Sequence, residues 1–276
     1  MAHLRLHVLD LGRLRMNARI LVGRGPLPFP KMVEAPISAF CIDHPDGRVL
    51  FDTGCHPQSM GPQGRWPQDY QRDYAHLGGE ECCLPHRLEQ LGLGPNDFRY
   101  VVLSHMHSDH AGCTEFFRKS RIIVHAGEFA AAMAAYKNRD QRAYGWQDTD
   151  ACLAAELDWR QVADDEGDLS LHEEVRLLNF GRGHAAGMLA LSVDLPEAGR
   201  IVLASDAVYC AENLLERRPP RWLADATGYE RAMDRIRALA NAVGARVRHN
   251  TTLNTAGTRH EIHTQLLARS QRGLRP

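Results

Sequence analysis

The 276-residue sequence lacks the features of a membrane-spanning or nucleic-acid-binding protein. No stretch approaches the ~18 consecutive apolar residues that a membrane-spanning helix needs. The formal net charge is −1, which gives no electrostatic argument for a nucleic acid or an anionic membrane as partner. Lysine is scarce, at Lys31, Lys119 and Lys137 only, and arginine forms no run longer than a pair such as Arg217–Arg218. We interpret these arginines as solvated surface residues.

Cysteine shows no sign of a disulfide framework or of a cysteine-ligated metal cluster. The seven cysteines are odd in number, and no two of them have the C-x-x-C spacing. The first residues also lack the continuous apolar segment of a secretory signal peptide. We therefore expect reduced thiols and a cytoplasmic protein. The sequence is compatible with a homodimer and does not require one.

The composition is that of a globular protein, with 44% hydrophobic and 24% charged residues. The length suits one large sandwich or two small domains. Because no internal linker or low-complexity tract interrupts the chain, we predict a single domain over residues 1–276, with a polar tail after about residue 250 that is hard to pack. The segments 55–79 and 138–170 are the least readable parts of the chain.

Hydrophobic periodicity predicts a chain rich in strands, with helices interspersed. The predicted strands cover residues 3–11, 37–42, 48–52, 100–103, 121–125, 175–180, 188–195, 200–204 and 245–248. The predicted helices cover residues 81–91, 126–137, about 150–162 and 229–243. We interpret residues 23–36 and 55–79 as loops because they are rich in glycine and proline.

Three histidines and an aspartate follow one short apolar run, and they are the strongest chemical signal in the sequence. On an extended backbone, His105, His107 and Asp109 project to one side, because side chains alternate along a strand. The composition of residues 108–112 is typical of a turn that opens a helix, which would direct His110 elsewhere. One segment can therefore offer ligands in two directions. That arrangement favours two adjacent metal ions over one.

This stretch resembles the H-x-H-x-D-H signature of the metallo-β-lactamase superfamily at all four positions. The resemblance implies a four-layer αββα sandwich, in which helices cover the outer faces of two packed sheets. Strand-rich halves, each closed by helices, agree with that architecture. The resemblance also implies a hydrolase, and it leaves the substrate open.

The resemblance supplies the remaining metal ligands, each a polar residue just past a predicted strand. It implies these two sets: His105, His107 and His184 for one ion, and Asp109, His110 and His249 for the other, with Asp206 bridging both. Two divalent ions are thus expected, zinc by default, although iron, cobalt or manganese suit similar ligands. His249 departs from the family pattern, because Asn250 follows it where aspartate is usual; His260 and His263 are alternatives.

The Asp52-Thr53-Gly54 turn is similar to a superfamily turn whose aspartate supports the metal-binding loop. A plain strand-ending Asx turn is the alternative. Asp206 itself distinguishes the chain from the β-lactam-hydrolysing members, which commonly have cysteine there.

Residues 206–214 resemble the N-acyl-homoserine lactonase branch, where a tyrosine three residues after the bridging aspartate faces the substrate carbonyl. Tyr209 has that position. The resemblance implies that hydroxide bridging two metals opens a lactone, a quorum-quenching type of activity. Tyr209 would stabilise the oxyanion, and Asp109 or a metal-bound water would protonate the leaving alkoxide.

Three alternatives stay open at this point. A pyridoxolactonase shares much of the pattern, and so does a glutathione-thioester hydrolase of the glyoxalase II kind. The third alternative is a metal-free binding module that keeps the fold and has lost the chemistry.

Overall fold

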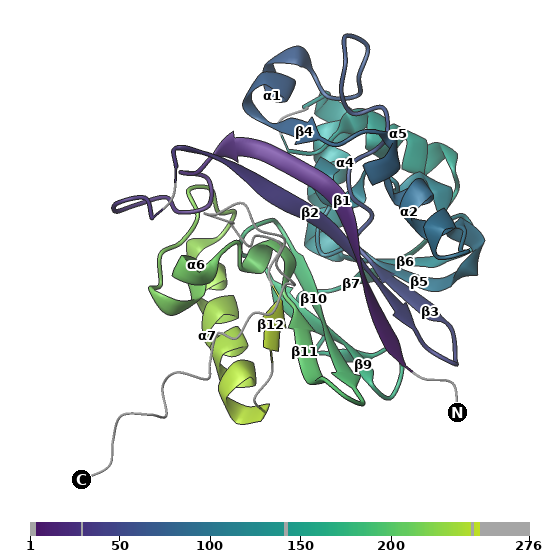
Figure 1. The fold of residues 1–276 in the computed structure, drawn as a ribbon, viewed down its shortest axis with the longest axis vertical. Helices are drawn as coiled ribbons and strands as arrows, with labels where there is room; N and C mark the ends of the chain where they lie inside the picture. The colour runs from purple at the N-terminus through teal and green to yellow at the C-terminus, as the bar shows by residue number, and fades with distance from the viewer. Residues whose placement is uncertain (1–3, 29, 141–142, 244–245, 249–276) are drawn as a thin grey trace.

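Two β-sheets packed face to face form the centre of the molecule, and helices cover their outer faces (Figure 1). The computed structural model describes residues 4–28, 30–140, 143–243 and 246–248. The strands are β1 Arg5–Asn17, β2 Met32–Asp43, β3 Arg48–Phe51, β4 Ala75–Leu77, β5 Phe98–Val102, β6 Arg121–His125, β7 Asp158–Val162, β8 Leu169–Ser170, β9 Val175–Gly181, β10 Met188–Leu195, β11 Gly199–Leu203 and β12 Arg246–Arg248. The helices are α1 Gln68–Asp73, α2 Leu84–Gln90, α3 Ser108–Ala111, α4 Ala126–Asn138, α5 Trp146–Ala154, α6 Ala211–Leu215 and α7 Ala226–Val243.

The sheets contain seven and five strands, in the orders β4-β1-β2-β3-β5-β6-β7 and β12-β11-β10-β9-β8. Alternation along β2 shows how the sequence builds the layers. Phe40 and Ile42 point into the core between the sheets, whereas Ala39 and Cys41 point to the helix-covered face. Both sides of the strand are buried over residues 39–42, which explains why this part of its sequence is apolar without interruption.

The outer layers are made by amphipathic helices. Leu84 and Leu88 of α2 pack in the core on the outer face of the seven-stranded sheet. Met233 and Ile236 of α7 pack in a separate core on the five-stranded sheet. The predicted αββα sandwich is confirmed.

The topology brings the chemically notable residues to one end of the sandwich. β3 and β5 are adjacent and parallel, so the residues that follow them, Asp52 and then the segment beginning at His105, leave the sheet side by side. His184 lies between β9 and β10, and Asp206 follows β11. Strand ends from both sheets therefore supply the site.

The N-terminal strands are longer than the sequence indicated. β1 continues to Asn17 because a bulge at Gly12, with φ +91°, absorbs the register shift between Asp10 and Arg13. β2 begins at Met32, so the interpretation of residues 23–36 as a loop was wrong for their last part. Proline at position 36 lies within the paired stretch of β1 and β2.

Two other predictions were wrong. Residues 55–79 contain α1 and the short β4, which pairs with β1, as well as loops. The helix predicted at about 150–162 is instead α5, ending at Ala154, followed by β7. Asp158 to Val162 pair in parallel with β6, and this pairing overrides the local helical pattern.

Arg65 ties the 55–79 segment to the rest of the molecule. Its guanidinium lies 2.9 Å from Glu115 Oε1 and 2.9 Å from Asp148 Oδ1, and all three side chains are at most 17% exposed. Burial raises the pKa of Asp148 to about 6 even with Arg65 beside it. The Arg65 cation therefore compensates the buried carboxylate of Asp148 and also pairs with Glu115.

Arg65→Ala should lower the free energy of unfolding by about 3–5 kcal/mol, because it leaves the buried carboxylate of Asp148 without its cation. Denaturant unfolding followed by circular dichroism measures this change. Arg72→Ala is the matched control, since Arg72 is 73% exposed and should change stability by no more than about 0.5 kcal/mol. Equal stabilities of the two variants would contradict the role of Arg65.

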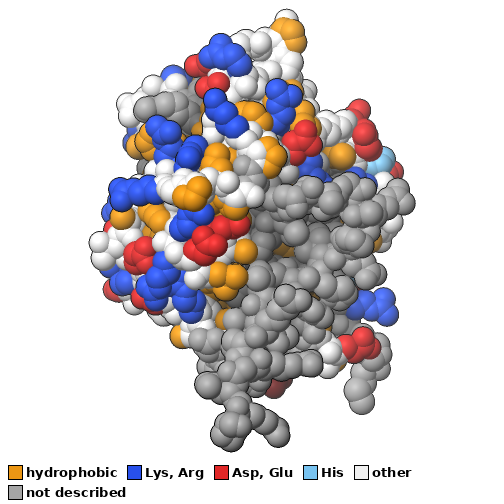
Figure 2. Space-filling model, turned by 60° about the vertical axis from the view of Figure 1, so that its left-hand side comes forward, with side chains coloured by type: hydrophobic (Ala, Val, Ile, Leu, Met, Phe, Trp, Pro, Cys, Tyr) orange, Lys and Arg blue, Asp and Glu red, His pale blue; other side chains and the backbone are white. Residues whose placement is uncertain are grey.

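The surface mixes both signs of charge. Figure 2 shows basic, acidic and apolar side chains interspersed over the coloured part of one face, in keeping with the formal net charge of −1. None of the helices within the described ranges is both long and apolar enough to cross a membrane.

Candidate metal centre

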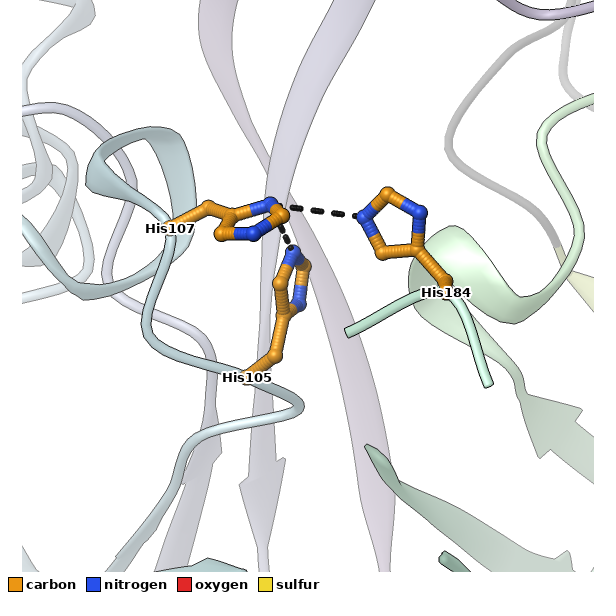
Figure 3. A group of neighbouring side chains, drawn as sticks. All are labelled: His105, His107 and His184. Carbon is orange, nitrogen blue, oxygen red and sulfur yellow. Dashed lines mark hydrogen bonds between the residues drawn. The ribbon is translucent and has the colours of Figure 1, made fainter. Parts of the chain in front are cut away.

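His105, His107 and His184 converge on one point (Figure 3). His107 Nδ1 lies 3.0 Å from His105 Nε2 and 3.3 Å from His184 Nε2. His105 and His184 are buried and His107 is half-buried. The structure thus brings together three predicted ligands that are up to 79 residues apart, as counted from 105 to 184.

The chemistry of this group fits a metal ion. Burial, reinforced by the neighbouring imidazoles, lowers the pKa of His107 to about 3 and that of His105 well below 6.5. Neutral imidazoles offer lone pairs, and three ring nitrogens that face one another are best satisfied by a shared cation. The buried Nδ1 of His184 has no hydrogen-bond partner among the described residues. No hydrogen bond from those residues to Nδ1 therefore fixes the orientation of the His184 ring.

The second predicted set lies beside the first and is more acidic. Asp206 Oδ2 is 3.4 Å from His110 Nε2, 3.6 Å from His184 Nε2 and 3.9 Å from His105 Nε2. Asp109 Oδ2 is 3.5 Å from His110 Nε2. One oxygen of Asp206 therefore faces both histidine groups, which is the placement expected of a bridging carboxylate.

Charge at the second set also favours a cation. Burial opposes ionisation of Asp206 and Asp109, but His110 outweighs it and holds the pKa of both carboxyls below 3.8. Burial would lower the pKa of His110, yet Asp206, Asp109 and Asp52 raise it well above 6.5. The carboxylates thus hold a positive charge at His110, and a metal ion among them would replace that proton.

Asp52 supports the segments of the predicted ligands by hydrogen bonds. Its carboxylate accepts hydrogen bonds from Ser104 N at 2.7 Å, Ser104 Oγ at 2.9 Å and Ser205 Oγ at 3.1 Å. It also lies 2.9 Å from His110 Nδ1, which fixes the ring with Nε2 toward Asp206. Asp52 and Ser205 adopt φ values of +62° and +47°, unusual for these residue types. These hydrogen bonds favour the predicted supporting role of Asp52 over the alternative, a plain strand-ending Asx turn.

The motif changes conformation at Ser108. His107 caps α3, and its carbonyl accepts from His110 N at 2.9 Å and Ala111 N at 3.0 Å. Asp109 therefore lies in a helical turn and does not continue the alternation of His105 and His107. The expectation that those three residues share one side of an extended backbone was wrong for Asp109, whereas the predicted helix opening is confirmed.

Tyr209 lies at the same site. Its side chain is buried, and its hydroxyl oxygen is 3.4 Å from His184 Nε2. The Asn213 side chain accepts from Tyr209 N at 2.9 Å and Cys210 N at 3.0 Å, which holds the turn in place. Burial, with the carboxylates of Asp206 and Asp109, raises the pKa of Tyr209 well above 10. The hydroxyl is therefore protonated at neutral pH and available as a donor.

A cavity of about 870 Å³ opens onto these residues. Its described lining includes His107, Asp109, His184, Asp206 and Tyr209. An apolar and aromatic wall is formed by Leu14, Met16, Ile20, Tyr70, Tyr74, Tyr144, Trp222 and Leu223. Asp69, Asp73 and Asp140 add carboxylates, and no lysine or arginine is among the described lining residues.

Sequence reasoning missed most of this wall. Tyr70 and Tyr74 lie in the 55–79 segment that was interpreted as a loop without a role, and their rings stack at 4.6 Å. The i, i+4 spacing of the two tyrosines was the available signal. His249, with the alternatives His260 and His263, lies outside the described residues; β12 ends one position before it, paired with β11.

Comparison with known proteins agrees with the fold. The model of the metallo-beta-lactamase superfamily matches residues 33–243, and the chain belongs to this superfamily. It is 42% identical over 247 residues to the N-acyl homoserine lactonase AiiB of Agrobacterium fabrum, covering 86% of this chain and 90% of that relative.

Two solved structures are similar in fold. A Bacillus thuringiensis AiiA mutant with N-decanoyl-L-homoserine bound at its active site superposes with a TM-score of 0.77 at 22% identity, covering 91% of this chain and 94% of that one. AidC, described as a dizinc quorum-quenching lactonase, has a TM-score of 0.66 at 13% identity, covering 91% and 88%.

Proposed function

We propose that this chain is a dinuclear metal-dependent hydrolase that opens lactone rings, with N-acyl-homoserine lactones as the substrate class. The observation that carries the proposal is the pair of buried histidine and aspartate groups facing a cavity with an apolar wall. The name of the AiiB relative, at 42% identity over most of both chains, supports the same substrate class. The activity is of the quorum-quenching type.

The proposed ligand sets are those that the sequence resemblance implied. His105, His107 and His184 would hold one ion, Asp109, His110 and His249 would hold the other, and Asp206 would be shared by both. Imidazole and carboxylate donors suit zinc, which is our default metal, and AidC is described as a dizinc lactonase. We further propose that residues 1–276 form one domain and that the protein acts in the cytoplasm.

Bound divalent ions supply an activated water near neutral pH and polarise the carbonyl that it attacks. The chain's own residues provide the rest of the chemistry. Tyr209, protonated and buried beside His184, donates a hydrogen bond to the developing oxyanion. Asp109 is ionised at neutral pH, so a carboxylate oxygen can accept the proton that the attacking water gives up and pass this same proton to the leaving alkoxide.

The cavity favours a neutral lactone over a glutathione thioester. An N-acyl chain is apolar and matches the wall that includes Met16, Ile20 and Tyr74. Glutathione carries two carboxylates, and the described lining residues include the carboxylates of Asp69 and Asp73 and no lysine or arginine. Like charges in a cavity with apolar walls repel more strongly than in bulk water. The glyoxalase II alternative is therefore disfavoured.

Tyr209→Phe should lower kcat for lactone opening by about ten- to a hundredfold, the lower part of the range for one oxyanion donor, because a metal shares the charge. Metal content should not change, since the phenol is not among the proposed ligands. Steady-state kinetics with N-hexanoyl-homoserine lactone measures the effect. An unchanged kcat would remove Tyr209 from the mechanism.

The substrate class is tested by a panel assay on the zinc-loaded protein. The panel contains N-acyl-homoserine lactones, simple γ- and δ-lactones, a pyridoxolactone, S-lactoylglutathione and a β-lactam. We expect kcat/KM for the N-acyl-homoserine lactones to exceed that for the thioester and the β-lactam. Faster turnover of S-lactoylglutathione than of every lactone would overturn the assignment, and faster turnover of the pyridoxolactone would move it to that alternative.

A further inference from the structure

Glu128 is a fully buried carboxylate that lies outside the proposed ligand sets. It is the third residue of α4, in the turn that directly follows β6. Burial raises the pKa of Glu128 to about 7, although several hydrogen bonds oppose that shift. A carboxylate removed from water is unfavourable unless donors surround it. The groups that donate hydrogen bonds to Glu128 therefore indicate its role.

Three donors from three separate segments meet at this carboxylate. Met106 N donates to Oε1 at 2.9 Å, Gly187 N lies 3.2 Å from Oε2, and the Tyr144 hydroxyl donates to Oε2 at 3.1 Å. Hydrogen bonds to a carboxylate are stronger than those between neutral groups. Glu128 thus clamps three segments that are distant in sequence.

Each clamped segment carries part of the site. Met106 stands between His105 and His107, so its N–H fixes the backbone from which both rings project. Gly187 follows His184 by three residues and precedes β10. Tyr144 lines the cavity, and its ring packs edge-on against His107 with centroids 5.2 Å apart.

Two glycines permit this approach. A Cβ at Gly187 would lie 2.0 Å from His125 Nδ1, and a Cβ at Gly127 would lie 2.7 Å from the Ala186 carbonyl oxygen. The segment after His184 therefore reaches the start of α4 only because both positions lack a side chain. This close contact is what brings Gly187 N within reach of the carboxylate.

The clamp spans the two sheets. The motif histidines leave β5 of the seven-stranded sheet, whereas His184 leaves β9 of the five-stranded sheet. Their ring nitrogens come within 3.3 Å of each other, as measured between His107 and His184. A metal tolerates a ligand displacement of only about 0.5 Å before binding suffers. A group that fixes the separation of the two segments therefore controls the site.

We propose that Glu128 is a positioning residue that sets the distance between the motif-histidine segment and the His184 segment, and that holds Tyr144 against both. The inference rests on the ligand sets of the proposed function and does not depend on the substrate. Glu128 touches neither metal nor lactone; it acts through the backbone of Met106 and Gly187.

Glu128→Gln tests the proposal with little change of shape. The amide keeps one acceptor oxygen and places an NH2 group where the carboxylate accepted, and a backbone N–H cannot turn away from it. We expect divalent-metal affinity, measured by chelator competition with cobalt and with zinc, to weaken by about 10- to 100-fold. The visible absorption spectrum of the cobalt-loaded protein should also change, because the histidine geometry changes.

Glu115→Gln is the matched control. Glu115 is 16% exposed and pairs with Arg65 and His56, away from the proposed ligands, so its replacement costs stability without altering the cobalt spectrum or the metal affinity. A merely structural role for Glu128 predicts that both variants behave alike, with a lowered Tm and the parent spectrum.

The proposal is overturned if Glu128→Gln folds with the parent's cobalt spectrum and with a metal affinity within twofold of the parent's. Should that variant not fold, Tyr144→Phe decides. Tyr144→Phe removes one hydrogen-bond donor to Glu128 and should weaken metal binding by about two- to tenfold, the contribution of one hydrogen bond. An unchanged metal affinity of this variant would refute the proposal. Failure of the parent to bind cobalt would refute the ligand sets and this proposal together, whereas failure to open lactones would refute the proposed substrate alone.

Discussion

His107→Ala is expected to lose metal and activity together. His107 Nδ1 is the atom that both His105 Nε2 and His184 Nε2 approach most closely, so the first ion would keep only two of its three histidines. Loss of an outer-shell partner alone typically costs 10- to 100-fold, and loss of a direct ligand should reduce kcat/KM by more than about a hundredfold. Elemental analysis and steady-state kinetics on one preparation measure both effects.

His76→Ala is the matched control for that variant. His76 is also buried, 9% exposed, and its ring nitrogen lies 3.0 Å from the Leu11 carbonyl oxygen rather than at the site. It should lower Tm and keep the metal content and kcat of the parent. If His107→Ala keeps its metal and its turnover, the metallo-hydrolase assignment is wrong.

Asp206→Asn is expected to remove about one of two bound ions and to lower kcat/KM by more than about a hundredfold. Two dications held close together repel, and a shared anion offsets that repulsion. The amide keeps the shape of the side chain and loses the charge. Asp206 Oδ2 lies 3.4–3.9 Å from the Nε2 atoms of His105, His110 and His184, and no other described carboxylate pairs with all three histidines.

Asp194→Asn controls for the loss of one negative charge. Asp194 is 40% exposed and pairs with Arg200 on the five-stranded sheet, away from the cavity lining described above. Metal stoichiometry and kinetics should match the parent. A full complement of metal in Asp206→Asn would show that this carboxylate does not bridge.

The parts of the fold and site that the sequence predicted are those encoded locally. Val101 and Val102 of β5 and the following Leu103 are fully buried, and the motif follows this apolar run directly, so strand and candidate ligands could be predicted together. Gly92, with φ +70°, follows α2 and stops the helix, as a glycine at this position predicts. His184 and Asp206 needed the family resemblance, because their place beside His105 depends on the packing of two sheets.

The parts that the sequence did not predict depend on contacts between distant segments. β7 is a strand because β6 offers it a parallel edge, although its own residues are compatible with a helix. In the sequence, Glu128 looks like any other polar residue of a helix. Its role depends on hydrogen bonds from Met106 and Gly187, which come from other parts of the fold. The aromatic wall at Tyr70 and Tyr74 depends likewise on α1, which local composition concealed.

The most direct measurement is the rate of N-hexanoyl-homoserine lactone opening as zinc is titrated into the metal-free protein. We predict negligible turnover without metal, a rise that saturates at about two equivalents, and recovery of an acyl-homoserine carboxylate as product. Turnover that is independent of added metal, or that is complete at about one equivalent, would contradict the dinuclear lactonase described here.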